Sequence, residues 1–291
     1  MTDVQGESIL RGHEERCREL IAGLTVMDDI LMRNVLNQTE CTEYVLQTIM
    51  GQKELKVLEC VVQKDYKNLQ GRSAILDCVA RDAEDRRYDV EIQNDGDAAS
   101  PQRARYHSGL MDMHMLRPGQ DFSELPESHV IFITEDDVLG HGLPIYHAGR
   151  KVYELDKDLG DGEQIIYVNA GVQDDTELGR LMHDLHCKNA DEMYSSVLAK
   201  RIRELKETEE GISHMSDEMR KEMETWYQEG VAFGQKQGKE QGIEIGEKNA
   251  KRETALSLAE MGFPVERIAQ VVKESISCVK QWIAEGTALA R

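Results

Sequence analysis

The sequence predicts an α/β fold in which a sheet is flanked by helices and is followed by an all-helical C-terminal extension. Two observations support this prediction. Up to about residue 225, short stretches rich in β-branched residues alternate with stretches of helical apolar spacing. Beyond that point the chain carries helical patterns alone. At 291 residues the chain is long enough for one domain of ordinary size and a smaller appendage.

The first predicted helical stretch covers residues 27–51, MDDILMRNVLNQTECTEYVLQTIMG. Its apolar side chains recur at roughly helical spacings, and it ends at Gly51. Glycine is common just after the last turn of a helix, because it adopts the left-handed backbone conformation without strain. We expect one or two packed helices here.

Three predicted strands follow, in ELKVLECVVQKDY, RSAILDCVARD and RRYDVEIQ. Each is rich in β-branched residues, and charged, turn-prone sequence separates them, so we expect a meander. In the third strand Asp89, Glu91 and Gln93 alternate with Val90 and Ile92, which directs the three polar side chains to one face. This alternation alone fits either a solvated sheet edge or a metal site.

The rest of the predicted first domain, residues 1–215, alternates helix and strand. SPQRARYHSGLMDMHML predicts a helix with Ser100 as its cap and Pro101 in its first turn. HVIFITED predicts a buried strand, KVYEL and QIIYVNA predict further strands that extend the sheet, and DTELGRLMHDLHCKNADEMYSSVLAKRIRELKETEE predicts a helical region that closes the domain.

Residues 216–252 form a glycine-patterned helical linker in this prediction. Glycine recurs at every fourth position: Gly230, Gly234, Gly238, Gly242 and Gly246. Four residues advance a helix by about 400°, so these glycines trace a slowly winding groove that a second helix can approach closely. The segment is either a helix ordered by self-association, which makes the protein a homo-oligomer through its C-terminal helices, or a frayed tether.

Residues 253–291 predict a small helical unit with the spacing of a helix-turn-helix. Ile268, Val271 and Val272 are expected to pack the first helix of the pair. The second helix, in SISCVKQWI, is expected to expose Ser277, Lys280 and Gln281. A three-helix cap or oligomerisation unit has the same apolar pattern, and we favour that structural role over DNA recognition.

Charge and composition limit the function classes. The chain has 35 basic and 55 acidic residues, a net charge of −20, which opposes nucleic-acid binding unless positive groups gather locally. It has no apolar run of about 18–20 residues, the length that a membrane span needs. The start lacks the pattern of a secretory signal, and the six cysteines lack the spacing of a disulfide framework. We therefore expect a cytoplasmic protein without membrane contact.

Asp77 is the first candidate for chemistry, because it lies within AILDCVA among small and apolar residues. A partly desolvated aspartate needs a cation or hydrogen-bond donors to compensate it. If the second and third predicted strands form a hairpin, Asp77 and Glu91 lie on neighbouring strands, where their oxygens can share one hard cation. By contrast, we give His183, His186 and Cys187 structural roles, since a zinc site needs about four ligands.

The arrangement of Asp77, thirteen intervening residues and then Glu91-Ile92-Gln93 resembles the PD-(D/E)XK nuclease superfamily. VEIQ followed by QRARYHSGL is similar to one of its branches, the recombination-promoting nuclease (Rpn) family, also called PD-(D/E)XK family transposases, in which glutamine replaces the usual lysine. The resemblance continues through GLPIYH, IIYVN, LGRLMHDLHCKNADEMY and RIRELKETEEG, over most of residues 25–215. It implies a restriction-endonuclease-like mixed sheet flanked by helices.

The resemblance also implies a metal-dependent DNA endonuclease linked to recombination or mobile-element DNA processing. Asp77 and Glu91 would hold Mg²⁺, with the backbone carbonyl of Ile92 as a third ligand. Gln93 would complete the catalytic set by orienting water or donating to a phosphate oxygen, although its amide adds no positive charge. The cation would polarise the phosphodiester and lower the pKa of a water molecule. Asp29 is a candidate for a water-mediated ligand, with helix capping as the favoured alternative.

Arg103 and Tyr106 are the predicted contacts to the DNA backbone. Arg103 and Arg105 match the basic RAR segment of the family, but residues two apart on a helix diverge by about 200° and cannot both face one phosphate. We assign the contact to Arg103, with Tyr106 on the same side of the helix. A surface ion pair is the alternative role for Arg103.

A second function stays open, that of a catalytically weak or inactive nuclease fold acting as an oligomeric interaction or regulatory protein. The negative net charge, the missing lysine and the glycine pattern of residues 216–252 support it.

Overall fold

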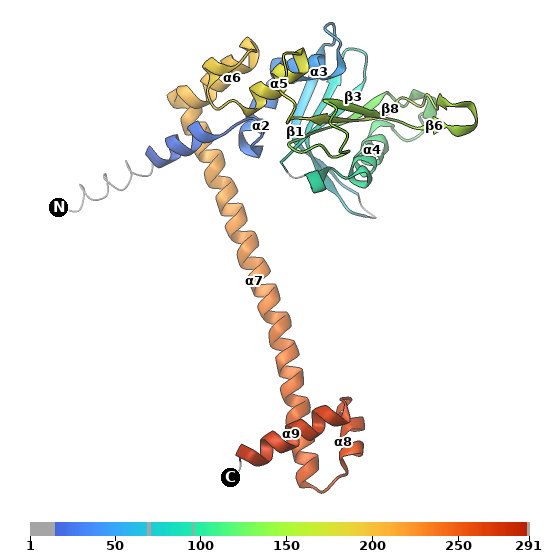
Figure 1. The fold of residues 1–291 in the computed structure, drawn as a ribbon, viewed down its shortest axis with the longest axis vertical. Helices are drawn as coiled ribbons and strands as arrows, with labels where there is room; N and C mark the ends of the chain where they lie inside the picture. Colours follow the sequence, from blue (N-terminus) through green and yellow to red (C-terminus); the bar gives the residue numbers. More distant parts are fainter. Residues whose placement is uncertain (1–14, 69–70, 95, 290–291) are drawn as a thin grey trace, which may run out of the picture. The chain divides into compact units, whose positions relative to one another are not determined.

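The computed structural model describes residues 15–68, 71–94 and 96–289. The chain divides into two compact units, Met1–Arg220 and Lys221–Arg291. The first unit contains a mixed six-stranded sheet flanked by helices, and the second unit is helical (Figure 1). The predicted α/β class, with its mixed sheet and helical C-terminal region, is confirmed.

The sheet has the strand order β1-β2-β3-β4-β8-β5. Its strands are β1 (Val57–Tyr66), β2 (Ala74–Asp82), β3 (Arg87–Gln93), β4 (Ser128–Thr134), β5 (Ile145–Ala148) and β8 (Glu163–Asn169). The first three strands form the predicted antiparallel meander. β4 then pairs in parallel with both β3 and β8, and β5 pairs antiparallel with β8. All seven residues of β4 are buried, as expected for a central strand covered on both faces.

The helices of the first unit flank the sheet on both faces (Figure 1). They are α2 (Asp29–Leu36), α3 (Thr39–Met50), α4 (Pro101–Met115), α5 (Glu177–His186) and α6 (Ser196–Glu207), with a helical segment over 15–23 and the start of α7 (Glu209–Glu260). Short 3₁₀ turns are η1 (Gly96–Ala99), η2 (Phe122–Glu124), η3 (Tyr153–Leu155) and η4 (Ala190–Glu192). α2, α3, α5 and α6 share one apolar core with the sheet, and α4 forms a second core with it.

Local signals at the ends of α3 and α4 match the predictions. α3 ends at Gly51, whose φ of 63° is the left-handed conformation that glycine adopts without strain. Ser100 caps α4, since its side chain accepts a hydrogen bond from the Arg103 backbone N–H, and Pro101 occupies the first turn. α4 is therefore fixed at its N-terminus, close to the end of β3.

Two strand predictions need correction. KVYEL does not extend the main sheet, because β6 (Lys151–Val152) pairs with β7 (Lys157–Asp158) in a separate two-stranded sheet, and η3 follows at once. Conversely β5 arises from IYHA, for which the sequence analysis predicted no strand. β5 is a half-buried edge strand of four residues, too short to show a clear period.

The second unit contains the remainder of α7, α8 (Val265–Val272) and α9 (Ile276–Leu289). Its core consists of Ala255, Ile268, Ala269, Val272, Val279 and Trp282. The prediction for Val271 is wrong, since this side chain is 58% exposed. The buried face of α8 is set by positions 268, 269 and 272, and Val271 lies about 100° away from Val272 on the helix.

The glycine-patterned stretch of α7 is helical in the structure. A Cβ atom placed on any of its five repeating glycines would meet no atom within 4 Å, so the helix surface is open there. Ser277, Lys280 and Gln281 are exposed on α9, as expected.

Within the described part of the chain, none of the helices combines the length and apolar character required to cross a membrane.

Candidate metal centre

The candidate site lies where β2 and β3 separate. Their ladder runs from Arg81–Arg87 to Cys78–Val90 and ends there, which leaves Asp77 and Glu91 as the next residues on each strand. The backbone N–H of Asp77 donates to Glu91 Oε1 at 2.9 Å. The Ile92 backbone amide lies close enough to the Asp77 carboxylate to favour its ionised form and lower its pKa, against the larger effect of burial. The hairpin of β2 and β3 therefore places Asp77 beside Glu91 on the neighbouring strand.

The backbone of β1 is strained opposite Asp77. Gln63 has a φ of 53°, a left-handed conformation that is unfavourable for a residue with a side chain. Its Nε2 lies 3.5 Å from Asp77 Oδ1. The irregular backbone thus places an uncharged donor beside the carboxylate, and a strand pattern gives no sign of it.

Asp89 and His107 complete the acidic centre, although the sequence analysis did not include them among the site residues. Asp89 and Glu91 are fully buried on β3, and His107 on α4 is 3% exposed. His107 Nδ1 lies 3.0 Å from Asp89 Oδ2 and 3.8 Å from Glu91 Oε1. The available signals were the alternation of Asp89 with Glu91 and the position of His107 one helical turn after Arg103.

Arg103 is directed at the acidic centre. Its Nη2 donates to Glu91 Oε2 at 3.1 Å, its Nε lies 3.3 Å from His107 Nε2, and its Nη1 donates to the Ala98 carbonyl at 3.1 Å. Of the two predicted roles, the ion pair is therefore formed, with a carboxylate of the site itself. Tyr106 donates to the carbonyl of Arg72, so its hydroxyl ties α4 to the segment before β2.

The surroundings of the centre disfavour the ionised form of its carboxyl groups. Burial raises the pKa of Asp77 to about 7, and the charges of Glu91 and Asp29 add to this rise. Burial, and then the charge of Asp89, raises the pKa of Glu91 to about 8. Burial also raises the pKa of Asp89 well above its ordinary value. A bound cation would reverse these shifts, because it favours the ionised form of each carboxyl group.

A divalent cation fits the side chains that are present. Asp89 Oδ1 is buried and has no hydrogen-bond partner among the described residues, although buried carboxylate oxygens normally have one. The donor set is rich in carboxylate oxygens, which Mg²⁺ and Mn²⁺ prefer. Gln93 Nε2 lies 3.4 Å from Glu91 Oε2 and brings no charge to the centre.

A basic hollow of about 840 Å³ opens beside the centre. Its lining residues are Arg72, Ser73, Ala74, Ile75, Ala98, Ser100, Gln102, Arg103, Arg105, Tyr106 and His107. Three arginines and no acidic residue line it, despite the net charge of −20 for the whole chain. Arg103 and Arg105 both border this hollow, which is larger than a single phosphate. Positive groups are therefore gathered next to the acidic centre, which phosphodiester binding requires.

A second cluster, His183, Asp184 and Cys187, has structural partners. Asp184 accepts hydrogen bonds from the backbone N–H groups of Tyr194 and Ser195 at 2.8 and 2.7 Å. Both carboxylate oxygens thus fix the segment that enters α6, in agreement with the structural role expected for this cluster.

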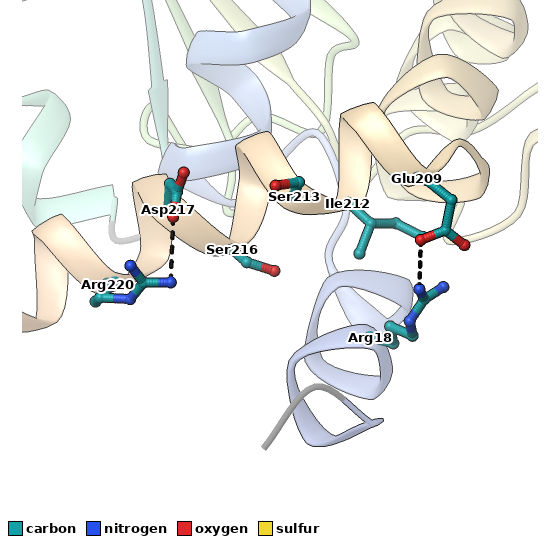
Figure 2. Close-up of a pocket in the computed structure, with 7 residues that line it drawn as sticks. All are labelled: Arg18, Glu209, Ile212, Ser213, Ser216, Asp217 and Arg220. Carbon is teal, nitrogen blue, oxygen red and sulfur yellow. Dashed lines mark hydrogen bonds and ion pairs between the residues drawn. The ribbon is translucent and has the colours of Figure 1, made fainter. Parts of the chain in front are cut away.

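Another hollow, of about 300 Å³, lies between the helical segment over 15–23 and the start of α7 (Figure 2). Arg18 pairs with Glu209 at 2.6 Å, and Arg220 pairs with Asp217 at 3.1 Å. These ion pairs belong to exposed side chains on the helix surfaces, so the acidic centre is the better candidate site.

Comparisons of this chain with protein-family models, with curated proteins and with solved structures find no match.

Proposed function

We propose that this protein is a metal-dependent DNA endonuclease with a restriction-endonuclease-like fold, acting in recombination or mobile-element DNA processing. The observation that carries the proposal is the meeting of Asp77 and Glu91 at the point where β2 and β3 separate, beside a hollow lined by three arginines. The order helix, three strands, helix, strand and the resemblance of residues 25–215 to the Rpn family support the same conclusion.

In this proposal Asp77, Glu91 and the carbonyl of Ile92 would hold Mg²⁺. When bound, the cation supplies a Lewis acid that polarises the phosphodiester and lowers the pKa of a water molecule. Gln93 lies next to Glu91 and orients the attacking water through its amide. Because Gln93 is neutral, it adds no charge stabilisation of its own, unlike the lysine that is usual at this position in the superfamily that the chain resembles.

The arginines of the hollow would bind the DNA backbone. Arg72 and Arg105 form no ion pair within the described residues, and both line the hollow, so their charge is available for phosphate groups. Tyr106 is 39% exposed at the same rim and can pack against a sugar or a base. Arg103 spans both features, because it lines the hollow while it donates to Glu91.

The test is cleavage of supercoiled plasmid with and without Mg²⁺. We expect nicked and linear products only with the cation, and loss of cleavage in Asp77→Asn and Glu91→Gln. Asp158→Asn is the matched control, since this exposed aspartate on β7 lies outside the centre. Cleavage that stays unchanged in both site variants would indicate a contaminating nuclease and reject the proposal.

The alternative, an interaction protein built on an inactive nuclease fold, is favoured by the surface of α7. Large apolar side chains are exposed along it: Met223, Trp226, Tyr227, Val231, Phe233, Ile243 and Ile245. Such a surface is typical of a helix that packs against a second copy or a partner. In this function the acidic centre has no catalytic role.

Truncation tests the alternative. We expect removal of residues 221–291 to reduce the particle mass in light scattering and to leave the first unit folded. The cut belongs after Arg220, because Met215 is buried in the core of the first unit. A truncated protein with the assembly state of the full chain would exclude oligomerisation through α7 and the small helical unit.

A further inference from the structure

Two carboxylates and one imidazole form a buried group beside Asp77. Asp89 and Glu91 come from β3, and His107 comes from α4. One ligand atom from each of the three lies within 4.8 Å of the others. The group exists because α4 packs on this face of the sheet, where Ala104, Leu110 and Met111 are buried against β4. It is thus held by two elements of the core and not by a loop.

The spacing within this group matches that of ligands on one cation. His107 Nδ1 lies 3.0 Å from Asp89 Oδ2 and 3.8 Å from Glu91 Oε1. Octahedral neighbours with bonds of about 2.1 Å lie about 3.0 Å apart, and tetrahedral ones about 3.4 Å apart. The two observed distances bracket the tetrahedral value, and the shorter one equals the octahedral value. Small side-chain adjustments therefore suffice for all three to bind one ion.

An unpartnered oxygen points to a positive ligand at this place. Asp89 is fully buried, and its Oδ1 has no hydrogen-bond donor among the described residues. The carboxyl groups of Asp89 and Glu91 are also within hydrogen-bonding reach of each other. Two carboxylates in contact need a proton or a cation between them, since both are acceptors when ionised. Both oxygens of Glu91 accept hydrogen bonds, from the Asp77 backbone N–H and from Arg103, whereas Asp89 has the His107 imidazole on Oδ2 and no partner on Oδ1 among the described residues.

We propose that Asp89, Glu91 and His107 form a second cation position, which selects a divalent transition metal such as Mn²⁺ over Mg²⁺. Imidazole nitrogen is a good ligand for transition metals, whereas Mg²⁺ prefers oxygen ligands and retains several waters. The position shares Glu91 with the Mg²⁺ site of the proposed nuclease. Its catalytic meaning rests on that proposed function, whereas cation binding by these three side chains does not.

Arg103 couples this position to the basic hollow. Without the cation, Arg103 donates to Glu91 and places its Nε 3.3 Å from His107 Nε2. A cation bound at Nδ1 leaves the proton of a neutral imidazole on Nε2, so two N–H donors then face each other. Arg103 must turn away from His107, and the hollow that it lines is the open space beside it. Loading of the cation thereby frees a guanidinium group for a phosphate.

Electron paramagnetic resonance of Mn²⁺ bound to the untagged full chain tests the proposal. A directly bound nitrogen gives a hyperfine coupling that oxygen ligands do not. We expect this coupling in the wild type and in Asp77→Asn, and its loss in His107→Gln and Asp89→Asn. His183→Gln controls for the other histidine-containing cluster and keeps the signal. Calorimetry should show at least about tenfold tighter binding of Mn²⁺ than of Mg²⁺, a preference that His107→Gln removes.

Circular dichroism establishes that each variant is folded, and His107→Asn replaces His107→Gln if the latter is not. Mn²⁺ bound through oxygen alone, no Mn²⁺ binding, or a nitrogen coupling that persists in a folded His107 variant overturns the second position. Plasmid cleavage alongside any of these results leaves the proposed nuclease standing. Nitrogen-bound Mn²⁺ without cleavage under any metal condition has the opposite meaning. It supports the second cation position and rejects the proposed nuclease activity.

Discussion

The two ends of the β2–β3 hairpin each bury an aspartate, with opposite electrostatic results. At the turn end, both oxygens of Asp82 are saturated with donors. Oδ1 accepts from the backbone N–H groups of Glu84 and Arg86, and Oδ2 accepts from Arg86 Nε at 2.6 Å and from the Tyr88 hydroxyl at 2.8 Å. Burial alone would raise the pKa of Asp82, but the hydrogen bonds outweigh it and hold this pKa below its ordinary value.

At the open end, Asp77, Asp89 and Glu91 lie close together, and the donors around them do not offset burial and mutual repulsion. Burial and mutual repulsion raise the pKa of Asp77 and of Glu91, and Asp89 keeps a buried oxygen without a partner. The comparison separates two uses of a buried carboxylate. A carboxylate whose oxygens all accept hydrogen bonds stabilises the hairpin turn. A group of buried carboxylates without enough compensation is stabilised by added positive charge, which a cation would supply.

The largest expected effect is the loss of activity when the open end is neutralised. Asp77→Asn should lower plasmid cleavage by roughly 10³-fold, because charge stabilisation at the phosphodiester is lost. The same change should leave the metal-free protein at least as stable as the wild type, since it removes a carboxylate that repels Glu91. Cleavage assays and thermal unfolding in EDTA measure the two effects. A marked drop in the metal-free melting temperature would show that Asp77 is a structural residue like Asp82.

Neutralising the saturated end should have the reverse outcome. Asp82→Asn leaves Arg86 and the Tyr88 hydroxyl facing an amide, and breaking such a buried pair costs about 3 kcal/mol. The melting temperature should fall by about 6–12 °C for a domain of this size. Cleavage per folded molecule should stay near the wild-type value at a temperature well below the transition. Wild-type stability in this variant would contradict the role assigned to the donors around Asp82.

The pH dependence of stability should also differ between the two ends. The pKa of Asp77 is raised from 3.8 to about 7, so the native state binds its proton more tightly than the unfolded state. Stability from this group is complete below about pH 4, is lost as pH rises toward 7, and is then constant. For Asp82, whose pKa is lowered, stability is present above about pH 4 and is lost in more acidic solution.

Unfolding in urea at pH 5 and pH 8, in EDTA, measures this difference. The wild type should lose on the order of 2 kcal/mol between the two pH values through the open end, and Asp77→Asn should lose less. Subtracting the change in unfolding free energy of the variant from that of the wild type removes the contribution of other titrating groups. Added Mn²⁺ or Mg²⁺ should restore stability at pH 8, because a ligand that binds only the native state stabilises it. Equal pH profiles for wild type and variant would remove the raised pKa from the explanation.

Sequence patterns predicted the parts of this site that depend on local order. The alternation in RRYDVEIQ placed Asp89, Glu91 and Gln93 together, and hairpin pairing brought Asp77 to Glu91. The contact between Asp89 and His107 depends on how α4 docks on the sheet, which no local period encodes. The left-handed backbone at Gln63 is likewise set by tertiary contacts, because glutamine has no intrinsic preference for it. The edge strand β5 was missed for a similar reason, since its four residues gain their strand conformation by pairing with β8.

The smallest expected effect comes from adding one positive charge to each end. Gln93 lies 3.4 Å from Glu91, and Gln52 accepts a hydrogen bond from Arg86 beside Asp82. Gln93→Lys should stabilise the metal-free protein by about 0.5–1 kcal/mol, because an ammonium group pairs with an under-compensated carboxylate. Gln52→Lys should give no gain, since it places a second cation next to Arg86.

Thermal unfolding in EDTA of these two variants and of Gln93→Met isolates the contribution of the charge. The methionine side chain has a length similar to that of glutamine and carries no charge. The same ammonium group competes with a divalent cation for Glu91, so Gln93→Lys should bind Mg²⁺ more weakly in calorimetry. If lysine at position 93 and lysine at position 52 shift the melting temperature equally, an added positive charge stabilises the two ends of the hairpin to the same extent. The contrast between a saturated and an unsaturated carboxylate would then no longer explain why a cation should bind at one end of the hairpin only.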